Sequence, residues 1–390
     1  MSDILLAHSY FLRFDSKQRE KVQPYPPLAT LYAASALREA GYSVALFDAM
    51  LSAGEHEFED AVRREKPRFV ALYEDSFNFL SKMCLSRMRE AAQRMARFAS
   101  ASGAKVIAAG PDVTDHPEQY LANKVDYALA GEGDRSLCEL IAALDSGEPE
   151  ISVSGVRSSD TCGATGLNLQ RRPPERNLDS LPMPAWDLVD IERYRAAWME
   201  AHGRFSLNMV TSRGCPFRCN WCAKPIWGQR YSVRSARSVA EELAYLKQRF
   251  SPDHIWFADD IFGLRANWLE QFVEEVTSRD AAIPYTIQSR ADLITARSAE
   301  ALAASGCREV WIGAESGSQK ILDAMEKGIT VEQIGKARAL LKTSGIRVGF
   351  FLQLGYPGET LDDILATVQL VRRTVPDTIG VSVSYPLPGT

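Results

Sequence analysis

The chain has 390 residues, of which 24% are charged and 46% hydrophobic, and its formal net charge is −5. These values are ordinary for a folded protein with a core, and they give no electrostatic reason to expect nucleic acid or an anionic membrane as a partner. No stretch approaches the roughly 20 apolar residues of a spanning helix, and the first residues lack a basic leader. We therefore expect a cytoplasmic protein without a membrane span.

The first half of the chain alternates short apolar runs with segments of helical periodicity. The alternation predicts a doubly wound parallel sheet over residues 1–150, in which ligands bind beyond the carboxyl ends of the strands. The predicted strands are 4–10, 43–49, 68–74, 105–110 and 125–131. The predicted helices are 26–42, 55–66, 83–103 and 136–147.

Glycine and proline gather in the loops that follow two of these strands. Gly110 and Pro111 follow the fourth predicted strand, and Gly131 and Gly133 follow the fifth. Residues without a large side chain let the backbone approach a large ligand closely, which makes these four candidates for cofactor binding. For any one of these loops alone, ordinary turn chemistry is the favoured explanation.

The second half begins after a connector. Residues 151–204 have little periodicity and contain a cluster of prolines, which predicts a linker with room for a small hairpin. Six strands then alternate with helices over 205–390, which predicts a partial (β/α)6 barrel. One helix is expected to begin at a capping box formed by Ser238 and Glu241. The chain stops directly after the sixth strand, so we expect that a C-terminal region is missing.

Three cysteines follow the first strand of the second half. Cys215, Cys219 and Cys222 have the spacing Cys-x₃-Cys-x₂-Cys. Zinc sites usually have four ligands in paired knuckles, and here only a dispersed histidine such as His202 could complete one. A 4Fe-4S cluster held by three thiolates keeps one iron open, so a small molecule is the better fourth ligand.

This motif, placed in the loop after the first barrel strand, resembles that of the radical S-adenosylmethionine (SAM) enzymes. In that family SAM binds the open iron of a 4Fe-4S cluster through its amino and carboxylate groups. The reduced cluster cleaves SAM to a 5′-deoxyadenosyl radical, and an external donor such as flavodoxin or ferredoxin supplies the electron. The resemblance makes Cys215, Cys219 and Cys222 the cluster ligands.

The resemblance also implies SAM contacts at the ends of the barrel strands. Trp221 matches a family position whose ring lies near the adenine of SAM. The alternative interpretation is that Trp221 is a tryptophan that only packs within the loop. The other implied contacts are Asp259 and Asp260 for the amino group, Arg290 for the carboxylate, Glu315 and Ser316 for the ribose hydroxyls or the amino group, and Gly355 for the adenine. Charged residues at strand ends need partners in any case, so an internal ion pair such as Arg290 with Asp259 is the alternative.

The front domain extends the resemblance to the cobalamin-dependent branch of the family, so that it covers nearly the whole chain. The motif Asp-x-His-x-x-Gly of another cobalamin-binding group is absent, which implies that no histidine from that motif binds cobalt. The loop after the third strand would face the corrin, with Tyr73, Glu74, Asn78 and Phe79 as candidates. A front domain that has lost cobalamin is the alternative.

The resemblance implies a methyltransferase that acts on an unactivated carbon of a small molecule. One SAM would give 5′-deoxyadenosine and a second would remethylate cobalamin, giving S-adenosylhomocysteine. The alternatives are a radical cyclase or ring-rearranging enzyme, as in anaerobic bacteriochlorophyll synthesis, and a non-catalytic protein that binds the cofactors. Methylthiotransferases have three further cluster cysteines in their front domain, and Cys84, Cys138 and Cys162 lie on unsuitable elements for that role. The sequence does not identify the substrate.

Overall fold

The computed structural model describes residues 2–77, 85–147, 153–158 and 171–390, which form two compact units. Unit 1 comprises Met1–Phe205 and Pro225–Trp227, and unit 2 comprises Ser206–Lys224 and Gly228–Thr390. The described part of the predicted linker therefore lies within unit 1. No helix in the described ranges is long and apolar enough to cross a membrane.

Unit 1 is built on a six-stranded sheet with the order β2-β1-β3-β4-β5-β6. The first five strands are parallel, and β6 is antiparallel to β5. The strands are β1 (Ile4–Ala7), β2 (Val44–Phe47), β3 (Phe69–Tyr73), β4 (Lys105–Ala109), β5 (Tyr127–Leu129) and β6 (Val156–Ser158). Strands β1 and β3 are buried on both faces, as expected for a parallel sheet covered by helices on each side.

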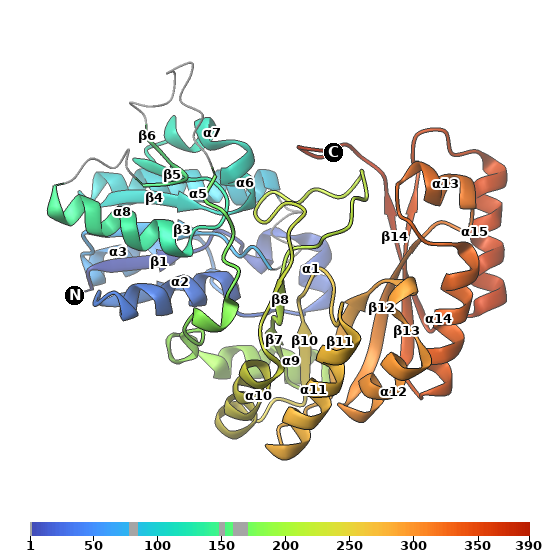
Figure 1. The fold of residues 1–390 in the computed structure, drawn as a ribbon. Helices are drawn as coiled ribbons and strands as arrows, with labels where there is room; N and C mark the ends of the chain where they lie inside the picture. Colours follow the sequence, from blue (N-terminus) through green and yellow to red (C-terminus); the bar gives the residue numbers. More distant parts are fainter. Residues whose placement is uncertain (1, 78–84, 148–152, 159–170) are drawn as a thin grey trace. The chain divides into compact units, whose positions relative to one another are not determined.

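The helices of unit 1 cover both faces of this sheet, which confirms the doubly wound prediction (Figure 1). Helices α2 and α8 pack against each other, as do α3 and α5. The α-helices are α1 (Ser16–Lys21), α2 (Leu28–Glu39), α3 (Glu55–Glu65), α5 (Leu85–Ala101), α6 (Pro111–Asp115), α7 (Pro117–Leu121), α8 (Asp134–Ser146) and α9 (Ile191–His202). The 3₁₀ helices are η1 (Leu12–Phe14), η3 (Leu178–Ser180) and η4 (Trp186–Leu188). The sequence patterns missed α9, which lies inside the expected connector, and the short helices α1, α6 and α7.

Unit 2 is built on a parallel sheet with the order β14-β13-β12-β11-β10-β7, in which each strand lies beside the next one in the chain. Its strands are β7 (Ser206–Met209), β10 (His254–Phe257), β11 (Tyr285–Ser289), β12 (Cys307–Glu315), β13 (Arg347–Leu354) and β14 (Thr378–Val383). A separate antiparallel pair consists of β8 (Ser212–Arg213) and β9 (Ser232–Val233). The six predicted β/α units of a partial barrel are thereby confirmed.

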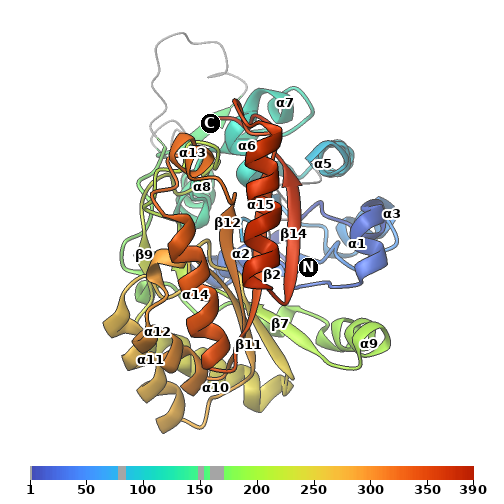
Figure 2. The same cartoon turned by 90° about the vertical axis from the view of Figure 1, so that its right-hand side faces the viewer.

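The helices of unit 2 lie on one face of its sheet (Figures 1 and 2). They are α10 (Ala236–Phe250), α11 (Ala266–Ser278), α12 (Ala296–Ala304), α13 (Gln319–Ala324), α14 (Val331–Thr343) and α15 (Leu361–Thr374), with η5 (Ala291–Leu293) after β11. Val310, Ile312 and Phe350 alternate along β12 and β13 and are fully buried. This alternation is the pattern of a sheet that packs helices on one face only.

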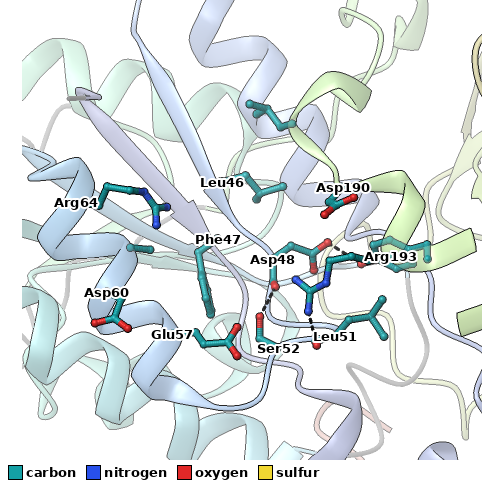
Figure 3. A pocket seen from close by; sticks show the side chains of 13 residues that line it. Leu46, Phe47, Asp48, Leu51, Ser52, Glu57, Asp60, Arg64, Asp190 and Arg193 are labelled. Carbon is teal, nitrogen blue, oxygen red and sulfur yellow. Dashed lines mark hydrogen bonds between the residues drawn. The ribbon is translucent and has the colours of Figure 1, made fainter. Parts of the chain in front are cut away.

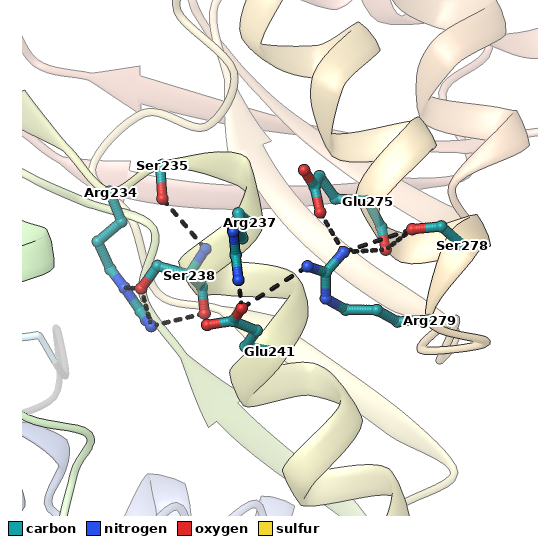
Figure 4. Close-up of polar contacts among 8 residues, drawn as sticks. All are labelled: Arg234, Ser235, Arg237, Ser238, Glu241, Glu275, Ser278 and Arg279. Carbon is teal, nitrogen blue, oxygen red and sulfur yellow. Dashed lines mark hydrogen bonds and ion pairs between the residues drawn. The ribbon is translucent and has the colours of Figure 1, made fainter.

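The start of α10 differs from its prediction. Ser235 is the N-cap, and its hydroxyl accepts a hydrogen bond from the Ser238 amide at 3.1 Å, so the expected capping box of Ser238 and Glu241 is wrong. Glu241 instead pairs with Arg237 one turn earlier and with Arg279 at the end of α11 (Figure 4). Two serines three residues apart both fit the N-cap preference, and the extended backbone of Ser235 decides between them.

Candidate functional site

The three cysteines lie on one loop at the carboxyl end of the unit 2 sheet. We call residues 214–224 the cysteine loop. It leaves β8, and the chain returns through β9, which pairs with β8 at the loop's base. Cys215, Cys219 and Cys222 are partly exposed, and none of them forms a disulfide within the described residues. The sequence therefore places three thiols at the carboxyl end of a parallel sheet, which is where ligands bind in βα barrels.

Asp259 anchors the start of this loop. Its carboxylate accepts hydrogen bonds from the Thr211 amide at 3.0 Å, from the Thr211 hydroxyl at 2.8 Å and from the Ser212 hydroxyl. Burial raises the pKa of Asp259 to about 6, because the ionised form is desolvated. The sequence left open an ion pair between Asp259 and Arg290. In the structure, Asp259 instead binds Thr211 and Ser212. Asp260, the next residue, is exposed.

Arg290 joins the cysteine loop to the end of β11. Its guanidinium lies 3.6 Å from the centroid of the Phe217 ring, and its Nη1 lies 3.9 Å from Cys219 Sγ. It also donates to the Lys327 carbonyl at 2.8 Å and to the Asp292 carboxylate at 3.0 Å. These contacts hold a buried cation directly beside one of the three thiols.

A second buried cation lies at the end of β12. Lys327 Nζ donates to Glu315 Oε1 at 2.7 Å, and both side chains are buried. The same Nζ lies 5.8 Å from the centroid of the Trp221 ring. The indole N–H of Trp221 is buried and has no hydrogen-bond partner within the described residues. Trp221 and Glu315, both predicted SAM contacts, are therefore brought together by a lysine that sequence reasoning missed.

Two other predicted SAM contacts are engaged by neighbouring elements. Ser316 is fully buried, and its hydroxyl bonds to the Thr367 hydroxyl of α15 at 3.2 Å. Gly355 has a positive φ of 79°, and its amide donates to Glu359 at 2.5 Å. Their roles in SAM binding stay predictions.

The far end of the cysteine loop is fixed by α13 and by the segment after β13. Asn220 makes three hydrogen bonds there. Its backbone amide donates to the Met325 carbonyl at 3.2 Å, and its Nδ2 donates to the Ala324 carbonyl at 2.9 Å. Its Oδ1 accepts a hydrogen bond from the Tyr356 hydroxyl at 2.9 Å. The loop is therefore held at both its base and its tip.

The donor set fits a three-thiolate iron–sulfur cluster. Among the residues that the structure describes, no three His, Cys, Asp or Glu side chains converge as ligands of a single metal ion would. A cubane cluster requires a different arrangement, because each thiolate binds a different iron atom. Burial raises the pKa of the Cys215 thiol. The Arg290 guanidinium lies beside the Cys219 thiol.

In unit 1, polar residues gather where the strand order changes direction, between β1 and β3. The Ser9 amide donates to both carboxylate oxygens of Glu74, at 3.0 and 3.1 Å. Burial raises the pKa of Glu74 and of Asp75. Burial lowers the pKa of His8, but the hydrogen bond to Asp48 at 2.9 Å and the negative charges of Asp48, Glu74 and Asp75 together outweigh burial and leave the pKa raised. In doubly wound sheets, ligands bind at such a switch point.

The predicted cobalamin contacts of unit 1 have protein neighbours in this structure. Tyr73 donates its hydroxyl to Asp134 at 2.7 Å, and a Cβ at Gly133 would lie 2.9 Å from the Tyr73 ring. A Cβ at Gly110 would lie 2.6 Å from Glu74 Cβ. Protein packing therefore accounts for these two glycines without a ligand.

The remaining unit 1 candidates are placed as follows. Pro111 is the first residue of α6, and the Gly131 amide donates to the Thr114 hydroxyl at 3.0 Å. Asn78 and Phe79 lie outside the described residues. Their roles in cobalamin binding stay predictions.

A cavity of about 360 Å³ in unit 1 lies between the end of β2, α3 and the start of α9 (Figure 3). Its polar groups have protein partners: Asp48 accepts from the Tyr194 hydroxyl at 2.6 Å, and Arg193 donates to the Leu51 carbonyl at 2.6 Å.

Comparison with known families assigns both units. The model of the Radical SAM superfamily matches residues 209–371, and the model of the B12 binding domain matches residues 21–141. The chain therefore belongs to the proteins that combine a B12-binding domain with a radical SAM domain. These two domains imply a 4Fe-4S cluster, SAM and cobalamin as cofactors.

Three known proteins illustrate the relationship. An uncharacterized methyltransferase of Pyrococcus horikoshii is 30% identical over 73% of this chain and 61% of its own length. The anaerobic magnesium-protoporphyrin IX monomethyl ester cyclase of Rubrivivax gelatinosus is 24% identical over 93% of this chain and 65% of its own. The chain thus spans less than two thirds of these curated relatives.

The third is a solved structure. It is that of the radical S-adenosylmethionine methyltransferase TsrM from Kitasatospora setae, with cobalamin and a 4Fe-4S cluster bound. It superposes with a TM-score of 0.77 at 20% identity, over 98% of this chain and 75% of that one. At this identity the likeness shows a shared fold.

Proposed function

We propose that the protein is a cobalamin-dependent radical SAM methyltransferase that acts on an unactivated carbon of a small molecule. The observation that carries the proposal is the cysteine loop, in which three thiols lie on one short segment and the buried Arg290 cation lies beside one of them, Cys219. The chain also has a B12-binding domain. The names of relatives support methyl transfer as the reaction.

When bound, the cofactors supply reductive cleavage of SAM and transfer of a methyl group through cobalamin. For each methyl group added, two SAM and two electrons yield one 5′-deoxyadenosine, one methionine and one S-adenosylhomocysteine. An external reductant such as flavodoxin or ferredoxin would supply the electrons.

The chain's own residues would hold and orient these groups. Cys215, Cys219 and Cys222 would be the thiolate ligands, and Arg290 would compensate part of the negative charge that three thiolates bring. Trp221 would lie against SAM, and its buried indole N–H would donate to it, which would satisfy a group that has no partner in the described protein.

Radical cyclisation is the second candidate reaction. The Rubrivivax gelatinosus cyclase aligns with 93% of this chain, a larger share than the methyltransferase relative covers. Both reactions would use the same cysteine loop, so the products of SAM distinguish them. A non-catalytic protein that binds the cofactors would form neither product.

The test is product analysis after anaerobic reconstitution with iron, sulfide and hydroxocobalamin. The protein receives SAM and a strong reductant, and the nucleosides are separated. We expect 5′-deoxyadenosine and S-adenosylhomocysteine together, both lost in Cys219→Ser and both kept in Cys138→Ser, a free thiol of α8. Deoxyadenosine alone would favour cyclisation, and neither product from a protein with a full cluster would refute the proposal.

A further inference from the structure

The sheet of unit 2 has one face covered by α10–α15 and an opposite face, which we call the inner face (Figures 1 and 2). Several side chains of the inner face have no role in the site described above. Residues that alternate with the buried Val310, Ile312 and Phe350 lie on this face. Trp311 of β12 and Phe351 of β13 are among them, and both are only partly buried.

Trp311 and Phe351 form a stacked aromatic pair, which we call the platform. Their ring centroids lie 4.7 Å apart, with an interplanar angle of 27°. A Cβ at Gly349 would lie 2.5 Å from the indole, so the indole rests directly on the backbone of β13. A Cβ at Gly380 would lie 3.3 Å from Trp311 and 3.4 Å from Phe351. Glycines in β13 and β14 thus make room for this stacked pair against the sheet.

The platform continues into the candidate site. Gly313 is the register partner of Phe351 on the same face. A Cβ at Gly313 would lie 2.6 Å from Lys327 Nζ and 2.7 Å from Glu315 Oε1, so this ion pair lies directly over Gly313. The same Nζ lies 5.8 Å from the ring centroid of Trp221 in the cysteine loop. A molecule on the platform would therefore be separated from the cysteine loop by little more than one ion pair.

An unpaired acceptor lies beside the platform. Gln353, two residues beyond Phe351 and on the same face of β13, is only 6% exposed. Its Oε1 has no hydrogen-bond partner in the part of the chain that is described. Its register partner Ser382 uses its hydroxyl on the Leu352 carbonyl at 3.2 Å. Buried acceptors in proteins are normally paired, so a donor from a bound molecule would satisfy this one.

The charges near the platform are paired within the protein. The indole N–H of Trp311 donates to Glu309 at 3.2 Å, and Glu309 also lies 3.8 Å from Arg347. Lys327 is paired with Glu315. The platform therefore offers stacking area and one acceptor, and little attraction for a strongly charged ligand.

We propose that the inner face binds the substrate, and that the substrate is a flat ring system with an N–H or O–H donor. The ring stacks on Trp311 and Phe351, and the donor reaches Oε1 of Gln353. That the bound molecule is the substrate rests on the proposed function. A molecule on this face would lie close to the cysteine loop, where the radical chemistry is proposed to occur.

The test measures binding of two flat probes to the reconstituted protein by equilibrium dialysis. Indole has a ring N–H, and benzothiophene has nearly the same shape without a donor. We expect Phe351→Leu to weaken both probes by about 10-fold, and Gln353→Leu to weaken indole alone by about 5-fold. Phe351→Tyr keeps the stacking ring and should bind both probes, and Phe250→Leu, a half-buried ring of α10, is the control.

The two proposals fail in different ways. Equal binding of both probes to the wild type and to the Phe351→Leu and Gln353→Leu variants would overturn the platform. A wild type that binds the probes as expected but releases no 5′-deoxyadenosine from SAM would refute the radical chemistry and leave the binding surface standing. Circular dichroism of each variant shows whether a loss of binding is a loss of fold.

Discussion

Replacing Asp259 with asparagine should change how the stability of the protein depends on pH. Asp259 is 1% exposed and binds the Thr211 amide and the hydroxyls of Thr211 and Ser212 at the start of the cysteine loop. Asparagine has nearly the same shape and keeps an oxygen for these donors, but it does not titrate. The comparison of Asp259→Asn with the wild type therefore isolates the ionisation of one buried carboxyl group.

The sign follows from the raised pKa. Burial raises the pKa of Asp259 to about 6, from its ordinary value of 3.8. Between these two values the folded protein binds more protons than the unfolded chain, so the free energy of unfolding falls as the pH rises through this window. Between pH 7 and pH 5 the free energy of unfolding of the wild type should rise by about 1 kcal/mol relative to that of the variant, and by about 2 kcal/mol at pH 4.

The assay is urea unfolding of the full chain, followed by tryptophan fluorescence at pH 7, 6 and 5. At each pH the free energy of unfolding of Asp259→Asn is subtracted from that of the wild type. The contributions of the other titrating groups cancel in this difference. Asp260→Asn, at the exposed neighbour, controls for the loss of one negative charge. A difference that stays constant with pH, or that grows as the pH rises, would refute the reasoning.

Two further changes test buried contacts within the units, and a third tests cluster binding. Glu242→Gln should destabilise the protein by about 3 kcal/mol, measured by thermal unfolding, because it removes the charge paired with the buried Arg234. Gly110→Ala should cost about 1–3 kcal/mol in the same assay, since its φ is 136° and its new Cβ would lie 2.6 Å from Glu74 Cβ. Arg290→Met should lower the iron and sulfide retained after reconstitution and desalting, because it removes the cation beside a cysteine ligand.

Each of these has a matched control. Glu241→Gln removes an exposed partner of α10 and should cost much less than Glu242→Gln. Gly41→Ala also has a positive φ, 93°, but nothing lies within 4 Å of its new Cβ, so it separates backbone strain from the clash at Gly110. Arg237→Met removes an exposed arginine of α10 and should leave the iron content unchanged. Equal effects in any pair would contradict the stated cause.

The cysteine loop could be predicted from the sequence because its signal is local. Cys215, Cys219 and Cys222 lie within one short segment, and their spacing needs no knowledge of the rest of the chain. The β/α alternation is local too, and it gave both sheets. Arg290 was found because it ends a strand, and parallel strands bring their carboxyl ends to one edge.

The partners of these residues could not be predicted, because they come from distant loops. Lys327 lies just beyond α13, in a segment with no distinctive pattern, yet it contacts both Glu315 and Trp221. The glycines after the strands of unit 1 could not be interpreted from the sequence, because the side chains that fill the space beside them also come from distant parts of the chain. The space beside Gly133 is filled by the Tyr73 ring, which comes from a strand sixty residues earlier in the chain.

The most direct test of the central claim is electron paramagnetic resonance of the reconstituted, reduced protein with and without SAM. The account predicts the signal of one reduced 4Fe-4S cluster, whose shape changes when SAM binds the iron that the three cysteines leave open. Cys219→Ser should lose most of this signal and Cys138→Ser should keep it. A full cluster signal that SAM does not alter would contradict the claim that the cysteine loop provides an open iron.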